Sequence, residues 1–373
     1  MVLTVALIDH LLVSEMRESL ETIKSAVRDL RAYSLSPHRT TIKLNQNENP
    51  WDAPLKIKEE TLSRLALRPW SRYPDFVPAS LHERLAQFAS WTPDGIIAGN
   101  GSNELIQAAL MVTIGETRRV LICEPTFALY RQVTTVLGGQ VQSVPLRADL
   151  QFDVPALLRG IEETQPQVTI ICSPNNPTGC TISDADLRAI LDAAPGLVVI
   201  DEAYHEFAGH SAVPLLHDYD NLVVLRTFSK AMALASLRLG YLLAAPELVT
   251  EIRKAVLPYN LNAFSQAAAE VALEMYESEL RPLVKMILAE RDRLFMEIQK
   301  IDGLEPVPSQ ANFMVVRSAL PPQEVFTELV RRDILIRDVS RYPMLHDYFR
   351  FSVGTPAEND LLLNAVREIF SAS

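Results

Sequence analysis

The chain has 373 residues, with 35 basic and 46 acidic side chains, a formal net charge of −11 and a pI near 5.2. Hydrophobic residues make up 48% and charged residues 22%, which excludes a disordered, collagen-like or coiled-coil chain and predicts two or three domains with a real core. An acidic chain repels phosphate backbones, so nucleic acid is not expected as a partner.

The chain has three cysteines, Cys123, Cys172 and Cys180. Three are too few for a disulfide framework, and an odd number cannot all form pairs. They indicate a reducing compartment, and we expect the chain in the cytoplasm. The apolar stretch 2–8 is interrupted by Asp9 and His10, and no basic residue precedes it. No stretch approaches the ~20 apolar residues of a membrane span, so we expect no membrane partner. The stretch is predicted to be an arm or helix that covers apolar surface, on a partner subunit in one alternative.

Between 80 and 256, short apolar runs alternate with segments of helical periodicity. Such runs suit strands that are buried on both faces, and they lie at 95–98, 119–122, 141–144, 168–171, 197–200, 222–225 and 239–243. Helical spacing occupies 103–113, 127–137 and 184–193, with Ser102 and Ser183 at the positions of N-caps. This alternation predicts an α/β fold with a doubly wound, mostly parallel sheet that binds ligands at the carboxyl ends of its strands.

After Ser265 the pattern changes to one long helical region that runs to about Lys300. Short strands follow near 313–316, 335–337 and 349–353, with a helix near 324–332. We therefore expect a second, smaller α+β domain at 277–373. The large ligand-binding domain is expected at 73–276, and residues 1–72 are expected to form an N-terminal arm and part of the small domain.

Several familiar motifs are absent from the sequence. The segment 99–101 (GNG) lacks the third glycine of a dinucleotide fingerprint, and no phosphate loop ends in Gly-Lys-Ser/Thr. His205 and His210 are five residues apart, so on a helix their rings would point ~140° away from each other. With no paired cysteines and no nucleophile elbow, we expect neither a metal site nor a serine hydrolase.

Chemistry-bearing residues gather in four segments that follow predicted strands. These segments are 99–104 (GNGSNE), 173–179 (SPNNPTG), 201–204 (DEAY) and 227–230 (TFSK). The carboxyl ends of parallel strands meet at one edge of a sheet, so we expect the four segments to form one site.

Three of these side chains suit covalent and acid–base chemistry. Lys230 follows a buried strand, and apolar surroundings favour the free amine that a Schiff base needs. Taken alone, a lysine at this position is more often an ordinary surface lysine in a turn. Asp201 also follows a buried strand, where a carboxylate needs a cation or several donors, or serves as a helix N-cap. Tyr204 can converge with Asp201 on one small ring if the chain turns there.

Other residues suit an anion. Gly101, Ser102 and Asn103 enter a helix whose first amides have no helical acceptor, and this makes an anion seat. Further donors that fit a phosphate dianion are Thr227, Ser229 and Arg238. Asn176, between two prolines, is either a turn residue or a donor held in place.

These residues match one small molecule, pyridoxal 5'-phosphate. It has a phosphate arm for the anion seat, an aldehyde for the lysine, a ring nitrogen for the aspartate and a ring oxygen for Asn and Tyr. The chain resembles the class I/II, fold-type-I aminotransferases, and within them the histidinol-phosphate aminotransferase family. The resemblance covers most of the chain and rests on the four segments together with 44–50 (LNQNENP), 72–74 (RYP) and 350–355 (RFSVGT).

The resemblance implies a role for each matching residue. Lys230 would carry the cofactor as a Schiff base, Asp201 would pair with its ring nitrogen, and Tyr204 and Asn176 would bond its ring oxygen. Phe127 stands where the family usually has a stacking Tyr. The residues that would bind the cofactor phosphate are Gly101, Ser102, Asn103, which stands where Asp is common, Thr227, Ser229 and Arg238.

The resemblance also implies substrate and partner contacts. Tyr73 would reach the cofactor phosphate of a neighbouring subunit, which implies a homodimer. Arg350 would bind the polar end of the substrate and Arg337 its phosphate, with Asn47 and Tyr33 as further substrate contacts. For each arginine, a surface ion pair is the alternative.

The implied activity is transamination between L-histidinol phosphate and 2-oxoglutarate by ping-pong kinetics, a step of histidine biosynthesis. Alternatives on the same fold are an aromatic-amino-acid aminotransferase and a phosphothreonine decarboxylase. A cofactor-binding module without turnover would be expected to have lost Lys230, Asp201 or Arg350, and a cofactor-free lysine aldolase would not need the phosphate seat.

Overall fold

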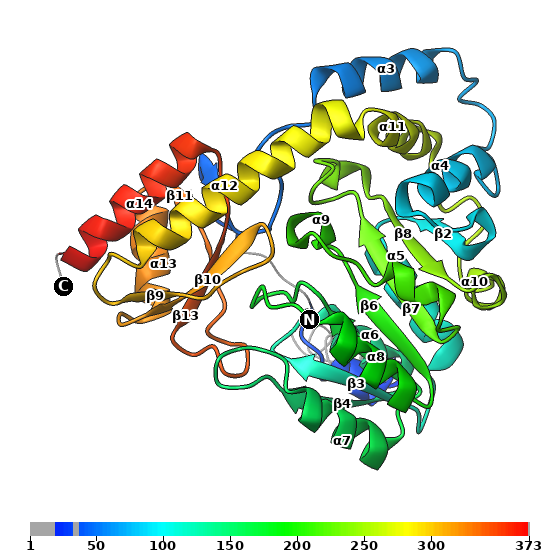
Figure 1. Cartoon of the computed structure of the whole chain (residues 1–373), viewed down its shortest axis with the longest axis horizontal. Helices are drawn as coiled ribbons and strands as arrows, with labels where there is room; N and C mark the ends of the chain where they lie inside the picture. Colours follow the sequence, from blue (N-terminus) through cyan, green and yellow to red (C-terminus); the bar gives the residue numbers. More distant parts are fainter. Residues whose placement is uncertain (1–18, 33–36, 372–373) are drawn as a thin grey trace, which may run out of the picture.

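The computed structural model describes residues 19–32 and 37–371, which form a large and a small body joined side by side (Figure 1). The expected N-terminal arm at 2–8 and Tyr33 lie outside the described residues.

The large body is built on a seven-stranded sheet with the order β2-β8-β7-β6-β5-β3-β4. All its strands run in one direction except β8, which is antiparallel to both of its neighbours. The predicted mostly parallel sheet is confirmed, and each predicted run lies within two residues of a strand. The strands are β2 Ile96–Gly99, β3 Arg119–Glu124, β4 Gln140–Pro145, β5 Val168–Cys172, β6 Leu197–Asp201, β7 Leu222–Thr227 and β8 Gly240–Ala244.

Helices cover both faces of this sheet, because the central strands are apolar on both sides. On one face pack α4 (Ala79–Ala89), α7 (Val154–Thr164), α8 (Asp184–Ala193) and α11 (Ala263–Glu274). On the other pack α5 (Ser102–Thr113), α6 (Leu129–Leu137) and α10 (Pro246–Arg253). Shorter helical pieces are α9 His205–Ala208 and the 3-10 turns Pro93–Gly95, Val213–His217 and Ala235–Leu237.

The two predicted helix caps have different outcomes. Ser183 caps α8, since its Oγ accepts from the backbone N–H of Asp186 at 3.1 Å. The prediction for Ser102 is wrong, because Gly101 is the N-cap of α5 and Ser102 is its first residue. Gly101 has φ +82°, a conformation that a side chain strains, so the chain turns into the helix one residue earlier than the serine indicated.

The small body has a four-stranded sheet with the order β12-β13-β10-β9 and a two-stranded parallel ladder of β1 with β11. Its strands are β1 Ile42–Lys43, β9 Leu304–Pro306, β10 Phe313–Ser318, β11 Ile334–Leu335, β12 Arg337–Asp338 and β13 Tyr348–Ser352. Its helices are α12 Arg281–Ile298, α13 Pro322–Arg331 and α14 Pro356–Ser371.

Two predictions for this part of the chain need correction. The helical region after Ser265 is not continuous, because a π-helical turn at Tyr276–Leu280 separates α11 from α12. The predicted strand at 335–337 is divided between β11 and β12, which belong to different sheets.

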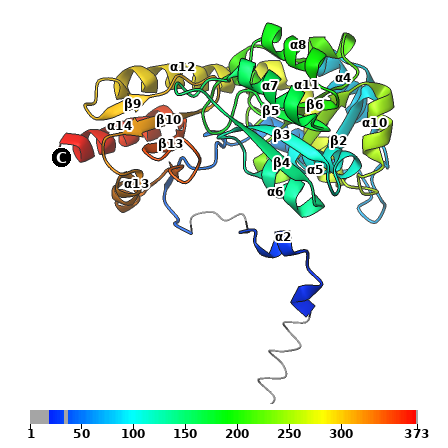
Figure 2. The ribbon, with the colours of Figure 1, turned by 90° about the horizontal axis from the view of Figure 1, so that it is seen from below.

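Three segments connect or flank the bodies. The helix α12 runs from the top of the large body across the small one, as Figure 1 shows. After β1 the chain passes to the large body, where α3 (Leu55–Ala66) packs against α11. The short helix α2 (Ser25–Arg28) lies beside α6, below the rest of the molecule in Figure 2, and the Lys24 amine donates to the carbonyl of Val136 at 2.9 Å.

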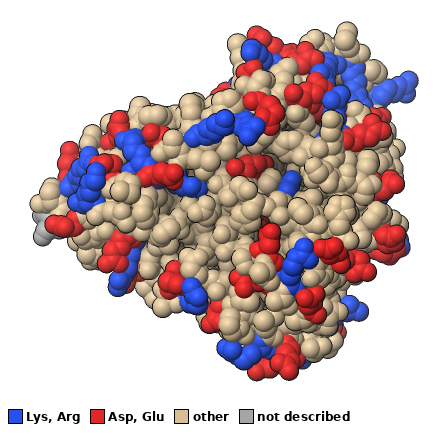
Figure 3. Space-filling model, in the orientation of Figure 1, with Lys and Arg blue, Asp and Glu red and all other residues tan. Residues whose placement is uncertain are grey.

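Tyr204, Phe207 and Ala231 of the large body share a buried apolar cluster with the small body. This cluster holds the two bodies together next to the carboxyl ends of the central strands. Basic and acidic side chains are interspersed around the rim of the face in Figure 3, and the middle of that face is mostly uncharged. Among the described residues, no helix is both long and apolar enough for a membrane span.

Candidate active site

One edge of the large sheet collects the chemistry-bearing segments. Because β2, β3, β5, β6 and β7 run in the same direction, the loops after all five strands emerge at this edge. The reversed strand β8 begins there, two residues after Arg238. A Cβ on Gly240, its first residue, would lie 2.4 Å from the Ser102 nitrogen, so glycine lets β8 approach the start of α5.

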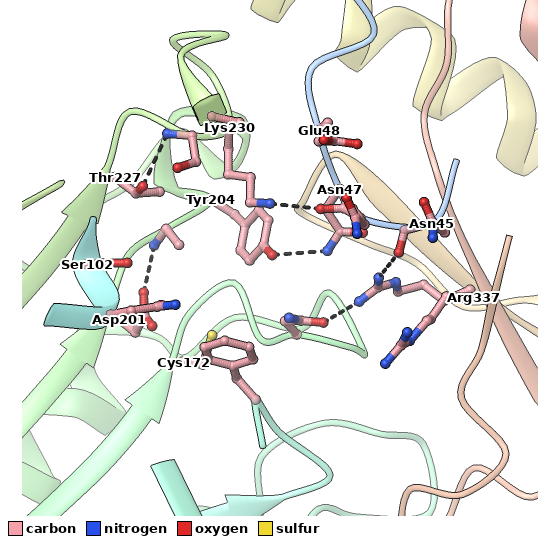
Figure 4. A pocket seen from close by; sticks show the side chains of 18 of the residues that line it. Asn45, Asn47, Glu48, Ser102, Cys172, Asp201, Tyr204, Thr227, Lys230 and Arg337 are labelled. Atoms are coloured by element: carbon pink, nitrogen blue, oxygen red, sulfur yellow. Dashed lines mark hydrogen bonds between the residues drawn. The ribbon is translucent and has the colours of Figure 1, made fainter. Parts of the chain in front are cut away.

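A cavity of about 540 Å³ opens between this edge and the small body. Figure 4 shows side chains from both bodies that point into it. Most residues predicted for the site line it: Asn47, Ser102, Asn103, Phe127, Asn176, Asp201, Tyr204, Thr227, Ser229, Lys230, Arg238, Arg337 and Arg350.

Lys230 lines the cavity and follows β7 by three residues. Its Nζ donates to the backbone carbonyl of Gln46 at 2.9 Å (Figure 4). Burial first, and then the nearby Arg350 guanidinium, lower the pKa of Lys230 to about 7. At neutral pH, a substantial fraction of the protein molecules therefore carry Lys230 as the free amine. Because Lys230 lines the cavity, the alternative of an ordinary surface lysine is wrong.

Asp201, the last residue of β6, is a buried carboxylate with one donor on each oxygen. The Tyr130 hydroxyl donates to Oδ2 at 2.6 Å, and the backbone N–H of Ala203 donates to Oδ1 at 3.1 Å. Burial raises the pKa of Asp201, while these two hydrogen bonds lower it. The alternative of a helix N-cap is not what the structure has, because the cap of α9 is Tyr204.

Tyr204 faces the cavity from the same side because the chain turns after β6. Its hydroxyl accepts from Asn47 Nδ2 at 3.0 Å, and Asn47 is held in turn by the Ser352 hydroxyl, which accepts from its backbone N–H at 2.8 Å. Burial raises the pKa of Tyr204, so its hydroxyl stays protonated near neutral pH. Nearby, the Asn45 Oδ1 is buried without a hydrogen-bond partner among the described residues.

A cluster of donors forms the expected anion seat. The Arg238 Nη1 donates to the Ser229 Oγ at 3.1 Å, and the Ser229 backbone N–H donates to the Thr227 Oγ1 at 3.1 Å. The first turn of α5 begins at Ser102 and leaves amides without helical acceptors. A Cβ on Gly101 would lie 2.6 Å from the Arg238 Nη2, so glycine brings the guanidinium against the helix start.

The small body contributes two arginines to the opposite wall. Arg337 on β12 and Arg350 on β13 are directly opposite each other in the antiparallel register. Arg350 is buried and donates to the Asn176 Oδ1 at 2.5 Å and to the carbonyl of Asn45 at 2.9 Å. The Arg337 side chain is partly buried and forms no ion pair with another described residue, which contradicts the surface ion-pair alternative.

One predicted residue of the described chain, Tyr73, lies away from this cavity. Tyr73 is 79% exposed and stacks on Tyr259, with ring centroids 4.5 Å apart. Tyr33 lies outside the described residues. Gly101 contributes backbone beside the cavity.

The sequence analysis missed Tyr130, Asn45 and the carbonyl of Gln46. Tyr130 had a signal, because it stands three residues after Phe127 in a segment of helical spacing, where the two side chains are neighbours.

The chain is similar throughout to proteins of one family. Residues 39–366 match the model of the class I and II aminotransferases. A histidinol-phosphate aminotransferase of Chlorobium phaeovibrioides is 38% identical over 356 residues, which cover 95% of this chain and 98% of that protein. Histidinol-phosphate aminotransferase 2 of Nitrosococcus oceani is 41% identical over 350 residues, which cover 92% of this chain and 96% of that protein.

A solved structure has the same fold. Histidinol-phosphate aminotransferase from Sinorhizobium meliloti, in complex with pyridoxal 5'-phosphate, superposes with a TM-score of 0.84 at 24% identity, covering 94% of this chain and 98% of that one.

Proposed function

The chain belongs to the class I and II aminotransferases, and from this membership we propose that it transfers the amino group of L-histidinol phosphate to 2-oxoglutarate, a step of histidine biosynthesis. Its cofactor is pyridoxal 5'-phosphate. This proposal follows the names of relatives that are similar over almost their whole length.

The donor chemistry of the cavity fits this cofactor at each of its polar groups. The seat of Ser102, Thr227, Ser229 and Arg238 suits the phosphate, and the lowered pKa of Lys230 suits a covalent bond to the aldehyde. The other residues that would hold the cofactor are Asp201 for the ring nitrogen, Tyr204 and the amide nitrogen of Asn176 for the ring oxygen, Phe127 for the ring face, and Gly101 and Asn103 at the helix start.

When bound, pyridoxal 5'-phosphate stores the electron pair released by breaking the substrate's Cα–H bond and carries the amino group between the half-reactions. Lys230 acts as the general base and then as the acid, because its pKa of about 7 lets the same Nζ take up and return a proton near neutral pH. The Gln46 carbonyl, which accepts from Nζ, restricts where the amine points.

Asp201 has the opposite task, since it must stay ionised to keep a ring nitrogen protonated. The hydrogen bonds from Tyr130 and Ala203 favour that charged form against the cost of burial. Tyr204 remains a neutral hydroxyl, and Asn47 orients it.

The cross-strand pair of Arg337 and Arg350 is the observation that carries the substrate assignment. Like charges directly opposite each other in a sheet are destabilising, so such a pair in a cavity wall favours an anionic ligand. A phosphorylated amine needs one guanidinium, and the carboxylates of 2-oxoglutarate need the other. The Arg337 side chain has no hydrogen-bond or ion-pair partner among the described residues, so we assign it the phosphate and Arg350 the carboxylate end.

The assembly is a homodimer in the cytoplasm. Tyr73 is exposed, and other large apolar side chains, Leu67, Trp70, Phe76 and Leu257, are exposed as well. A second copy of the chain covering them would bring Tyr73 to the partner's cofactor phosphate. All three cysteines are buried free thiols, in keeping with a reducing compartment.

A donor panel tests the substrate assignment. Purified holoenzyme is given 2-oxoglutarate with L-histidinol phosphate, phenylalanine, tyrosine or phosphothreonine, and both glutamate formation and carbon dioxide release are followed. We expect histidinol phosphate to have the highest kcat/KM, with parallel double-reciprocal lines. A preference for phenylalanine that Arg337→Ala does not change would overturn the assignment, and so would carbon dioxide release from phosphothreonine.

A further inference from the structure

Tyr130 connects two walls of the cavity without lining it. It is the second residue of α6 and is fully buried, in the apolar cluster beneath the sheet edge. Its ring lies edge-on to Phe127, with centroids 5.6 Å apart and planes at 88°. Its hydroxyl donates to the Asp201 Oδ2 at 2.6 Å. One side chain therefore contacts both the residue assigned to the cofactor's ring face and the residue assigned to its ring nitrogen.

The short distance marks a charge-assisted hydrogen bond. An O–H group that donates to an ionised carboxylate lies typically about 2.5–2.7 Å from it, and such bonds are among the strongest in proteins. The Tyr130 hydroxyl has no access to water, and its polar neighbours are the Asp201 carboxylate and the Cys172 thiol, of which the carboxylate is much the stronger acceptor. On the carboxylate, Tyr130 occupies one oxygen and the Ala203 N–H the other. These two contacts fix the rotation of the carboxylate plane.

The same bond opposes the effect of burial on the charge of Asp201. Burial raises the pKa of this carboxyl, and the hydrogen bond from Tyr130 is the largest of the effects that lower it. The charge of Lys230 acts in the same direction more weakly. Without the Tyr130 hydroxyl, the buried carboxylate would hold its proton to higher pH and would keep only the backbone donor.

From this geometry we propose that Tyr130 is a positioning residue, which orients the Asp201 carboxylate and keeps it ionised toward the cofactor's ring nitrogen. The inference rests on the cofactor assignment of the proposed function and on no substrate. The alternative is a purely structural role. In that case the hydroxyl only completes the hydrogen bonding of the buried core, and its loss affects folding alone.

The test compares two ligands of the apoenzyme that differ only at the ring nitrogen. One is pyridoxal 5'-phosphate, and the other is its carbocyclic analogue, in which a CH group replaces that nitrogen. Dissociation constants are measured by quenching of tryptophan fluorescence. The ratio of the two constants reports the contact of Asp201 with the ring nitrogen, and general damage to the cavity cancels from it.

We expect Tyr130→Phe to reduce the preference for the natural cofactor about tenfold or more, the effect expected when a hydrogen bond to a charged group is lost. The matched control is Tyr241→Phe, which removes an equally buried hydroxyl that contacts Arg226 at 3.5 Å and not Asp201. The control should keep the wild-type ratio. A wild-type ratio in Tyr130→Phe, or an equal loss in both variants, overturns the proposal.

A double-mutant cycle tests whether Tyr130 acts through Asp201. In an Asp201→Asn background, Tyr130→Phe should change the ratio no further, and an additional, independent loss overturns the proposal. If Tyr130→Phe does not fold, as judged by circular dichroism, 3-fluorotyrosine at position 130 supplies a more acidic donor in the same place. The preference should then rise, and an unchanged or lower preference counts against the proposal.

These measurements involve no turnover, so they separate this inference from the proposed function. A failed donor panel with an altered ratio in Tyr130→Phe removes the substrate assignment and leaves the role of Tyr130 in place. A successful panel with an unaltered ratio keeps the substrate assignment and removes the role of Tyr130.

Discussion

Replacing Arg337 by Gln separates binding of the substrate phosphate from every other task of the cavity. Arg337 is partly buried in the cavity wall opposite Arg350 and has no ion-pair partner among the described residues. Its loss should therefore affect only ligands that carry a phosphate. Histidinol phosphate and L-histidinol, the same donor without the phosphate, are the two substrates that show this.

The magnitude follows from the kind of contact and from its exposure. Hydrogen bonds to charged groups are worth about 1.5–3 kcal/mol, and solvent near a partly buried guanidinium screens part of that. We take about 1.5–2 kcal/mol, which corresponds to about a 10- to 30-fold loss of kcat/KM for histidinol phosphate. For L-histidinol the change should stay below about twofold, since no phosphate contact is lost.

A second expectation concerns the stability of Arg337→Gln, which should not decrease although its activity does. Removing one of two like charges that face each other across strands relieves a repulsion of about 0.2–1 kcal/mol, so the melting temperature of Arg337→Gln should not fall. Arg317→Gln is the matched control, because Arg317 is an exposed arginine on β10 of the same sheet, and it pairs with Glu305 at 3.4 Å. An equal loss of activity toward both donors, or a similar loss in the control, would refute the assignment of Arg337.

Three further outcomes follow from the structure. Because burial lowers the pKa of Lys230 to about 7, the free amine is lost as the pH falls below that value. The rate of covalent attachment of pyridoxal phosphate to the apoenzyme, followed by stopped-flow absorbance, should therefore drop up to about tenfold per pH unit below about pH 6. Gly101→Ala places a Cβ 2.6 Å from Arg238 at φ +82°, so cofactor affinity measured by fluorescence titration should fall at least about tenfold, whereas Gly115→Ala, where a Cβ meets open space, should leave it unchanged. Tyr73→Ala should weaken cofactor binding while sedimentation still shows a dimer; a monomeric wild-type chain with full cofactor affinity would contradict the dimer proposal.

The sequence predicts the large sheet well because its signal is local. The runs that became β5, β6 and β7 are apolar without alternation, and this pattern matches their burial on both faces. The segments after these strands were expected to form one site, and the cavity residues Lys230 and Asp201 lie there because parallel strands end at a common edge.

The remaining features depend on contacts between distant parts of the chain. The break between α11 and α12 had one local signal, Pro282, which fits only the first turn of a new helix. The division of 335–337 into two strands had none, since it depends on pairing of β11 with β1 and of β12 with β13. The Gln46 carbonyl that accepts from Lys230 is a backbone atom, so no residue type reveals it.

The covalent bond between Lys230 and the cofactor is the central expectation, and reductive trapping tests it most directly. Holoenzyme is treated with borohydride and digested, and the pyridoxyl-modified peptide is identified by mass spectrometry. We predict one modified lysine per chain, Lys230, in the segment 227–230 that follows β7, and no adduct in Lys230→Ala. An adduct on another lysine, or none in protein incubated with the cofactor, would contradict the account.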